Sequence, residues 1–502
     1  MAAVRFALDP AFAIGSVDRR LFGSFVEHMG RSVYSGIYEP SHPTADAAGT
    51  RGDVLELVRE LGVSVVRYPG GNFVSSYRWE DGVGPVEHRP HRLDLAWRSL
   101  ESNEFGVNEF LSWCADAGTE PMLAVNLGTR GVQEACDLLE YCNHPSGTYL
   151  SDLRAAHGVE KPHGVRLWCL GNEMDGPWQI GGKTADEYGR LAAETGKAMR
   201  LLDPEVELVL CGSSNSTMPT FGSWEATVLE HAYDYVDYLS LHSYYDPSDG
   251  DLDSFLASAV EMDRFIDAVI ATCDHVAART RRRRKINLSF DEWNVWYQGA
   301  FSGPENLEWQ RAPRLIEDQY TVADAVVVGS LLISLLRHAD RVSVACLAQL
   351  VNVIAPIMTQ PGGPAWAQTI FHPFALTARY AGQQVLRVEP VGPTYDTARH
   401  GDVPVVDATA TIDPDGAVAM FVVNRSRDAV PLQVDLRALP GRAAATHTAL
   451  YDADWNARNT AEDPQRVRPR DVAAVAVDDG VMATTLPPVS WNLIRLAPPA
   501  VS

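Results

Sequence analysis

The sequence lacks any long, uninterrupted apolar run. The strongest candidate, residues 326–336, contains Gly329, Ser330 and Ser334 and is far too short for a membrane span. It is predicted to form a helix that is either buried or lies at an interface. The N-terminal residues also lack the apolar core of a secretory signal. These absences lead us to expect a cytoplasmic protein that does not associate with a membrane.

Basic residues are also scarce. The chain has 42 lysine and arginine residues against 65 aspartate and glutamate residues, and its formal net charge is -23. Because phosphate binding needs a basic surface, this balance argues against nucleic acid as a partner. A neutral substrate is compatible with it. The one basic run, Arg279 with residues 281–285, is interpreted as a solvated helix end without a function of its own.

Signatures of metal and cofactor sites are missing as well. The sequence has neither the ligand spacing of a zinc site nor a glycine-rich phosphate-binding loop, so no metal or cofactor is expected. Its seven cysteines lie in core-like segments without paired spacing, which is typical of reduced cysteines that serve packing. They are Cys114, Cys136, Cys142, Cys169, Cys211, Cys273 and Cys346.

What the sequence does contain is a regular alternation of apolar runs and longer amphipathic segments. Eight short runs predict strands, at residues 21–25, 63–68, 122–126, 165–170, 207–211, 236–241, 286–290 and 342–347. Helices are predicted at residues 54–61, 105–117, 132–141, 184–202, 252–278 and 322–337. Over residues 16–383 this pattern favours an α/β fold, a (β/α)8 TIM barrel with long loops. A doubly wound open sheet is the alternative, but the glycine fingerprint that usually follows its first strand is missing.

The texture of the sequence changes after about residue 383. Residues 384–502 contain short apolar runs, several of them alternating, which are separated by turn residues such as those at 413–416. This pattern predicts a C-terminal antiparallel β-sandwich. Residues 1–15 contain a short strand that needs a neighbour for its backbone hydrogen bonds. We therefore expect this N-terminal strand to join the C-terminal sandwich.

Two of the predicted barrel strands lead directly into carboxylates. The fourth is followed by Asn172 and Glu173, and the seventh by Asp291 and Glu292. These strands lie on opposite sides of a closed barrel, so Glu173 and Glu292 can meet above its mouth. Two carboxylates there, without metal ligands or a Ser-His pair beside them, indicate glycoside hydrolysis. The weaker interpretation is that both carboxylates only cap barrel loops.

Other strand ends carry groups that suit a sugar pocket. Polar side chains there can form hydrogen bonds to sugar hydroxyls, and tryptophan rings can contact the apolar face of a sugar. The polar candidates are Glu27, Asn72, Asn126, Asn172, His242, Tyr244 and Gln349. The tryptophan candidates are Trp97, Trp178, Trp293 and Trp296. Each of them alone is more often structural, so the prediction rests on their shared position at or near strand ends.

Several longer motifs carry a family resemblance. Residues 170–173 (LGNE) together with 291–294 (DEWN) resemble the acid/base and nucleophile segments of retaining barrel glycosidases. Four further motifs resemble the intracellular α-L-arabinofuranosidases of glycoside hydrolase family 51, and this resemblance is highly specific and extends over nearly the whole chain. The motifs are FGSFVEH at 22–28, RYPGGNF at 67–73, RLDLAW at 92–97 and AVNLGTRG at 124–131.

The resemblance implies a retaining, exo-acting enzyme that removes terminal α-L-arabinofuranosyl units from arabinan, arabinoxylan or short oligosaccharides without a metal. By motif position, Glu173 would be the general acid/base and Glu292 the nucleophile. The residues that would hold the sugar hydroxyls are Glu27, Asn72, Asn172, Tyr244 and Gln349, with Trp97 and Trp296 near the rim of the pocket. Such enzymes are commonly oligomeric, so we expect a homo-oligomer, by resemblance a hexamer.

A retaining mechanism also sets geometric expectations. The carboxyl groups of Glu173 and Glu292 should lie roughly 5 Å apart, whereas about 9 Å would mean inversion through a water. Asn172 and Tyr244 are expected to hold the Glu292 carboxylate by hydrogen bonds. Two competing interpretations remain: another barrel glycosidase, such as an endo-acting xylanase or glucanase, and a non-catalytic carbohydrate-binding protein that keeps the fold.

Overall fold

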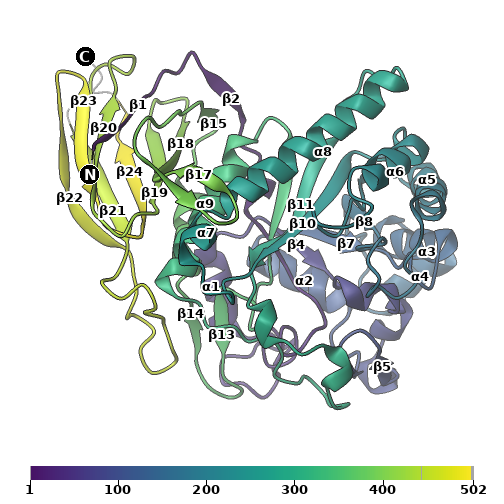
Figure 1. Cartoon of the computed structure of the whole chain (residues 1–502). Coiled ribbons are helices and arrows are strands. Elements are labelled where there is room, and N and C mark those ends of the chain that lie inside the picture. The colour runs from purple at the N-terminus through teal and green to yellow at the C-terminus, as the bar shows by residue number, and fades with distance from the viewer. Residues whose placement is uncertain (1, 443, 499–502) are drawn as a thin grey trace.

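The central feature of the computed structural model, which describes residues 2–442 and 444–498, is a closed barrel of eight parallel strands (Figure 1). The strands follow one another around the barrel in the order β10–β11–β12–β3–β4–β7–β8–β9. Their bounds are β3 Gly23–Phe25, β4 Val65–Tyr68, β7 Glu120–Ala124, β8 Leu167–Leu170, β9 Glu207–Leu210, β10 Tyr238–Tyr245, β11 Asn287–Val295 and β12 Val342–Ala348. Each of the eight predicted strands is present, and the predicted TIM barrel is confirmed.

The helices surround the barrel. Five of the six predicted helices are present as α1 Gly52–Leu61, α2 Val107–Ala117, α3 Val132–Asn143, α5 Ala185–Leu202 and α9 Val322–Arg337. The predicted helix at 252–278 is instead two helices, α7 Leu252–Leu256 and α8 Ala259–Arg279, which are separated by Ala257 and Ser258. Three further helices were not predicted: α4 Tyr149–Ala156, α6 Ser223–Ala232 and α10 Phe371–Tyr380.

Strands β10 and β11 are longer than the sequence predicts. They continue to Tyr245 and Val295, so Glu292 and its neighbours lie on a strand and not beyond its end. The pairing of these two strands shifts register between Ser240 and His242, after which His242 lies opposite Glu292. Such a bulge re-aims the side chains that follow it. The irregularity therefore lies at the mouth of the barrel, where the predicted site is.

Ten further strands form one sheet, in the order β1–β20–β23–β22–β21–β24–β19–β18–β15–β2. Buried side chains from β1, β18, β20 and β24 share one apolar core, so the sheet folds over on itself as a sandwich. The N-terminal segment belongs to this sheet, since β1 pairs with β20 and β2 pairs with β15. Its strands are β1 Val4–Ala7, β2 Ala13–Ser16, β15 Gln384–Leu386, β18 Val406–Ile412, β19 Val418–Asn424, β20 Val430–Asp435, β21 Ala444–Leu450, β22 Arg470–Asp478, β23 Val481–Leu486 and β24 Ser490–Leu496.

Helix α9 joins the barrel to the sandwich. It contacts β18, β19 and β24, as well as the neighbouring helices α8 and α10 (Figure 1). A Cβ atom at Gly329 would overlap the indole of Trp491 on β24, so glycine permits this close packing. The apolar segment 326–336 is therefore covered within the chain. Of the two alternatives for this helix, burial is correct and an exposed interface is wrong.

Three simpler expectations concern the surface and the cysteines. None of the helices described here is long and apolar enough to cross a membrane. All seven cysteines are free. In the basic run, three arginines form ion pairs, as those of a solvated helix end would: Arg279 with Glu230 on α6, and Arg282 and Arg284 with Asp234 and Asp237 on the loop after α6.

Candidate active site

Glu173 is placed by a sharp turn after β8. Gly171 has φ +93, a backbone conformation that glycine adopts without a steric penalty, and Glu173 itself has φ 42. A non-glycine residue in this left-handed region often marks a functional site. The turn brings both carboxylate oxygens to hydrogen-bonding partners: Oε1 is 2.9 Å from His242 Nδ1, and Oε2 accepts the Trp178 Nε1–H at 2.6 Å.

Glu292 lies on β11 and is 5% exposed. Its Oε1 accepts a hydrogen bond from Arg67 Nη1 at 2.6 Å, and its Oε2 accepts one from the Tyr244 hydroxyl at 2.8 Å. The expected contact from Tyr244 is confirmed. The expected contact from Asn172 is wrong, because its amide nitrogen donates to Gln179 Oε1 at 3.4 Å, while its amide oxygen accepts a hydrogen bond from Arg67 Nη2 at 2.7 Å. Arg67 thus takes the role that the sequence assigned to Asn172.

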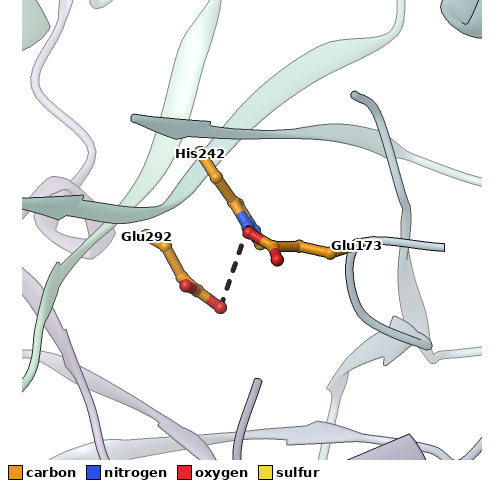
Figure 2. A group of neighbouring side chains, drawn as sticks. All are labelled: Glu173, His242 and Glu292. Carbon is orange, nitrogen blue, oxygen red and sulfur yellow. Dashed lines mark hydrogen bonds and ion pairs between the residues drawn. The ribbon is translucent and has the colours of Figure 1, made fainter. Parts of the chain in front are cut away.

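The two glutamates face each other across one cavity. Figure 2 shows Glu173, His242 and Glu292 converging from separate segments of the barrel, and one oxygen or nitrogen of each lies within 4.8 Å of the others. The cavity has a volume of about 600 Å³. The limit of 4.8 Å agrees with the separation of roughly 5 Å expected for a direct nucleophile, and it is shorter than the separation of about 6.5–9.5 Å that is typical of inverting enzymes.

A buried charge network lies beneath the glutamates. Arg67, which is 1% exposed, lies 3.2 Å from Asp291 as well as contacting Glu292 and Asn172. Burial alone would raise the pKa of Asp291, but Arg67 and His242 hold it below its ordinary value. Asp291 therefore remains a carboxylate. A buried arginine with three polar partners keeps the base of the site rigid.

His242 lies between the carboxylates. Burial lowers the pKa of its imidazole, but Glu292, Asp291 and Glu173 outweigh this effect and raise the pKa to about 10. Its Nδ1 contacts Glu173, and its Nε2 lies 3.6 Å from Asp291. At neutral pH the ring is an imidazolium that partly balances the surrounding carboxylates.

Glu27 is a third carboxyl group at the same mouth. Burial raises its pKa to about 8, and the charge of Glu292 adds to the rise, although hydrogen bonds from Phe73 N and Trp97 Nε1 oppose it. Both donors are 2.9 Å from Glu27 Oε1. A Cβ atom at Gly71 would lie 3.1 Å from Glu292 Oε1 and 3.5 Å from Glu27 Oε2. Glycine here keeps the space between the two carboxyl groups open.

Most of the predicted sugar-binding residues line this cavity. They are Glu27, Asn72, Trp97, Trp178, Tyr244, Trp296 and Gln349. Gln349 also accepts the Glu27 backbone N–H at 3.2 Å. His242 contacts Glu173, and Asn172 is connected to Glu292 only through Arg67; neither residue lines the cavity wall.

Two candidates do not belong to the site. Trp293 is fully buried, because it follows Glu292 on β11 and successive side chains of a strand point to opposite faces. Asn126 stabilises its own loop, since its side-chain oxygen accepts the N–H groups of Gly128 and Thr129 at 3.0 Å each. Both predictions are wrong for these local reasons.

Sequence reasoning missed several parts of the site. Arg67 was quoted only within a motif, yet an arginine inside the apolar strand β4 is a signal, because a buried charge needs a partner. The polar loop 214–217 and Glu261, on the first turn of α8, also line the cavity. No sequence spacing connects them with the carboxylates, and only the closure of the barrel brings them together.

Among the described residues, Glu173, His242 and Glu292 are the one group whose donor atoms could converge on a metal ion. Their atoms already contact one another, and Arg67 lies 2.6 Å from Glu292. The positive charges of Arg67 and the imidazolium oppose a cation at this position. The arrangement suits a neutral sugar whose anomeric carbon gains positive charge during reaction.

Two family models match the chain. The α-L-arabinofuranosidase 1 domain matches residues 57–264, and the α-L-arabinofuranosidase C-terminal domain matches residues 291–490. The intracellular exo-α-(1→5)-L-arabinofuranosidase of Streptomyces lividans is 62% identical over 100% of this chain and 76% of that protein. The enzyme of the same name, numbered 1, from Bacillus subtilis (strain 168) is 53% identical over 99% of each chain.

Solved structures lead to the same family. A family 51 α-L-arabinofuranosidase from Bifidobacterium longum has a TM-score of 0.95 and 47% identity, with 99% of this chain and 100% of that chain covered. The thermostable GH51 α-L-arabinofuranosidase from Thermotoga petrophila RKU-1 has a TM-score of 0.88 at 34% identity, with 99% and 100% covered. By sequence and by structure, the chain belongs to the α-L-arabinofuranosidases of glycoside hydrolase family 51.

Proposed function

We propose that the protein is a retaining exo-α-L-arabinofuranosidase that hydrolyses terminal non-reducing α-L-arabinofuranosyl residues of arabinan, arabinoxylan and shorter oligosaccharides. The observation that carries this proposal is the pair Glu173 and Glu292, with oxygens within 4.8 Å of each other in one cavity. Inversion would need carboxyl groups about 6.5–9.5 Å apart. The relatives at 62% and 53% identity are named as exo-acting arabinofuranosidases.

In the first step Glu292 acts as the nucleophile. One of its oxygens forms a bond to the anomeric carbon while the bond from that carbon to the leaving oxygen breaks, and Glu173 gives its proton to that oxygen. Arg67 and Tyr244 hold the Glu292 carboxylate in a fixed orientation, at 2.6 and 2.8 Å. The product of this step is a glycosyl ester on Glu292.

In the second step Glu173 acts as a base. It takes a proton from a water molecule, whose oxygen attacks the anomeric carbon and displaces the Glu292 carboxylate. Each step inverts the anomeric centre, so the arabinose released has the configuration of the substrate. His242, held between the two glutamates, positions both side chains through the exchange of charge.

The sugar itself would be recognised by the residues around the glutamates. We assign contacts with its hydroxyl groups to Glu27, Asn72, Asn172, His242, Tyr244 and Gln349, and apolar contacts to Trp97 and Trp296. Trp296 packs edge-on against Tyr244, with 5.2 Å between ring centroids, so it supports the same wall. No cofactor takes part in this scheme.

We propose a cytoplasmic homo-oligomer, a hexamer by family resemblance. The intracellular names of the relatives support the location. Association is supported by the hairpin of β5 Arg92–Asp94 and β6 Ser99–Glu101, which leaves Leu93, Leu95 and Leu100 55%, 57% and 40% exposed. A monomer in light scattering at working concentration would contradict this part of the proposal.

We also propose two domains. Residues 16–383 would form the catalytic barrel, and residues 384–502, together with 1–15, would form a sandwich that supports it through α9.

The experiment that tests the activity is a panel of aryl glycosides followed by arabinan and arabinoxylan. We expect release from the α-L-arabinofuranoside alone, and single arabinose units from the polysaccharides. Release of oligosaccharides would favour an endo-acting xylanase or glucanase. Inactivity on every substrate would favour a non-catalytic carbohydrate-binding protein. The presence of both Glu173 and Glu292 argues against that alternative.

A further inference from the structure

Both oxygens of Glu173 have a hydrogen-bonding partner. Oε2 accepts the indole N–H of Trp178 at 2.6 Å, and an indole nitrogen can only donate. Oε1 lies 2.9 Å from Nδ1 of His242, whose other nitrogen faces Asp291. The imidazolium form of His242 donates at both nitrogens. Two donors at its oxygens therefore stabilise the carboxylate form of Glu173, because hydrogen bonds to the charged form favour it.

The proposed mechanism requires the opposite state before the first step. Glu173 must then carry a proton, which it gives to the leaving oxygen. Withdrawal of one of the two donors would raise the proton affinity of Glu173 before this step. His242 is 2% exposed and held between three carboxylates, so it is fixed. Trp178 is 47% exposed, lines the cavity, and lies on the loop between β8 and α5.

The loop that carries Trp178 is rich in glycine. Gly176 approaches the Trp178 ring so closely that a Cβ atom there would lie 2.7 Å from its Cε2, and Gly181 has φ +75. Glycine is required at both places for different reasons: the first leaves room for the indole, and the second allows the turn. The indole is thus held over Glu173 by the backbone of this loop and not by burial in the core.

We propose that Trp178 is a positioning residue that the leaving group displaces. With the cavity empty, its N–H holds Glu173 as a carboxylate. A leaving group that enters the cavity moves the indole away from Oε2, and Oε2 then takes a proton from solvent. This inference rests on the proposed arabinofuranosidase function, because it assigns Trp178 to the two roles of Glu173 in that reaction.

The contacts of Glu173 Oε2 therefore differ between the two steps of the reaction. In the first step the Oε2–H proton passes to the leaving oxygen as the glycosidic bond breaks and the Glu292 ester forms. When the leaving alcohol departs, Trp178 returns and stabilises the carboxylate. Oε2 has a second lone pair, so it can accept the indole N–H and the proton of the attacking water. The same tryptophan thereby favours the acid in one step and the base in the other.

The first test does not depend on catalysis. The full-length protein is labelled with 5-fluorotryptophan, and the Trp178 signal is assigned by its loss in Trp178→Phe. We expect the ¹⁹F shift of Trp178 to titrate with pH and to lose this titration in Glu173→Gln. The Gln variant is needed because other charged groups face the same space, namely Asp175 on the loop, His242 on β10, Asp291 and Glu292 on β11, Arg67 on β4, and Glu27 and Glu261 on the cavity wall.

The second test is the pH profile of kcat/KM on an arabinose disaccharide. Trp178→Phe keeps an aromatic face but removes the N–H that stabilises the carboxylate. The high-pH limb should move upward by about one pH unit, because a hydrogen bond to a charged group is lost. The matched control is Trp309→Phe, at a residue that is 38% exposed and lies outside the cavity wall, and its profile should equal that of the parent.

The outcomes separate the two proposals. A Trp178 signal that does not respond to pH, or that still titrates in Glu173→Gln, would overturn the inference. So would a pH profile of Trp178→Phe that superimposes on the parent profile. A signal that titrates with Glu173, combined with no release of arabinose from any substrate, would overturn the proposed function and support the Trp178–Glu173 contact.

Discussion

Buried charges gather in two regions of this molecule, and the two regions are balanced differently. Where α9 meets the sandwich, Asp263 and Asp407 are matched by Arg337 and Arg425. At the mouth of the barrel, Arg67 and the imidazolium of His242 face the carboxyl groups of Glu27, Glu173, Asp291 and Glu292.

The difference in balance shows at Asp407 and Glu27, although burial also raises the pKa of Asp263 in the first region, and Arg67 and His242 lower that of Asp291 despite its burial in the second. Burial would raise the pKa of Asp407, but Arg337 and Arg425 outweigh it and hold the pKa below its ordinary value. At the mouth, burial raises the pKa of Glu27 to about 8. A matched cluster stabilises the fold, whereas an excess of carboxyl groups leaves some with altered protonation, which acid–base chemistry can use.

The largest expected effect comes from removing the nucleophile. Glu292→Ala should lower kcat by about 10⁴-fold or more on every arabinofuranoside, because no covalent intermediate can form. Glu173→Ala should keep much of its first-step rate on aryl substrates whose leaving groups need no proton, and should fail on natural linkages. Steady-state and burst kinetics on both substrate types measure this difference.

Azide distinguishes the two roles further. In Glu173→Ala, azide can replace the activated water without help from a base, and the expected product is the retained α-configured glycosyl azide. A retained azide from Glu292→Ala, with only the inverted β-azide from Glu173→Ala, would mean that the roles are reversed. Product configuration by NMR decides between these outcomes.

The next largest effect is expected at Arg67, the arginine at the mouth of the barrel. Arg67→Met leaves Asp291 and Glu292 buried with His242 as their remaining counter-charge, which should cost about 3 kcal/mol of stability and most of the activity. Arg67→Lys restores a charge but cannot contact Asp291, Glu292 and Asn172 at once, so it should recover stability more than kcat. Urea denaturation and kcat of both variants provide the test, and a kcat of Arg67→Met close to the parent value would contradict it.

The role of Arg67 shows where sequence reasoning stops. The eight barrel strands could be predicted because each is a short apolar run with a helix or turn signal behind it. The contacts of Arg67 could not, because they join β4 to β8 and β11, more than 100 residues away along the chain. Glu173 and Glu292 could be predicted from the sequence because each follows a strong strand pattern. Their spacing of about 5 Å follows from the closure of the barrel.

The errors also have local causes. Helix α10 was missed because Pro373 interrupts its pattern, although proline is tolerated in the first turn, where its missing N–H is not needed. Trp293 could have been rejected from the sequence, since a strand that points Glu292 inward must point the next side chain outward. Trp178 was considered only for its apolar face, and its hydrogen bond to Glu173 depends on a loop conformation that no pattern encodes.

A smaller effect, on stability but not on kcat, is expected at Arg425, where α9 meets the sandwich. Arg425 is 3% exposed and donates to Asp407 and Ser330 at 2.7 and 3.0 Å. Arg425→Met should cost about 3 kcal/mol of stability by leaving Asp407 short of a partner, with kcat of the folded enzyme unchanged. Arg437→Met is the control, because its ion pair with Asp435 lies on the surface and should contribute nothing measurable. A fall in kcat for Arg425→Met would show that the two regions are coupled.

The last effect, which is the smallest when taken per pH unit, is a pH dependence that tests the comparison itself. The pKa of Glu27 is about 8 in the folded protein, against an ordinary value of 4.5. Between these values the folded state keeps a proton that the unfolded state has lost, so the stability linked to Glu27 is complete below about pH 4.5 and is lost as the pH rises through 8. Glu27→Gln cannot titrate, and its side-chain oxygen can still accept the N–H groups of Phe73 and Trp97. Relative to this variant, the parent should lose roughly 1.4 kcal/mol of stability for each pH unit in that window.

The corresponding substitution where α9 meets the sandwich, Asp407→Asn, should give a pH dependence of stability with the opposite sign. The folded-state pKa of Asp407 is lowered, so its contribution is present at neutral pH and is lost only as the pH falls through that lowered value. Asp407→Asn should therefore be less stable than the parent at neutral pH, and the difference should shrink in acid. Urea denaturation of the parent and Glu27→Gln from pH 4 to 8 tests the first sign, and urea denaturation of the parent and Asp407→Asn from pH 4 down to about pH 2 tests the second. If the gap between Glu27→Gln and the parent is constant from pH 4 to 8, Glu27 titrates as an ordinary carboxyl group, and the contrast between the two regions fails at Glu27.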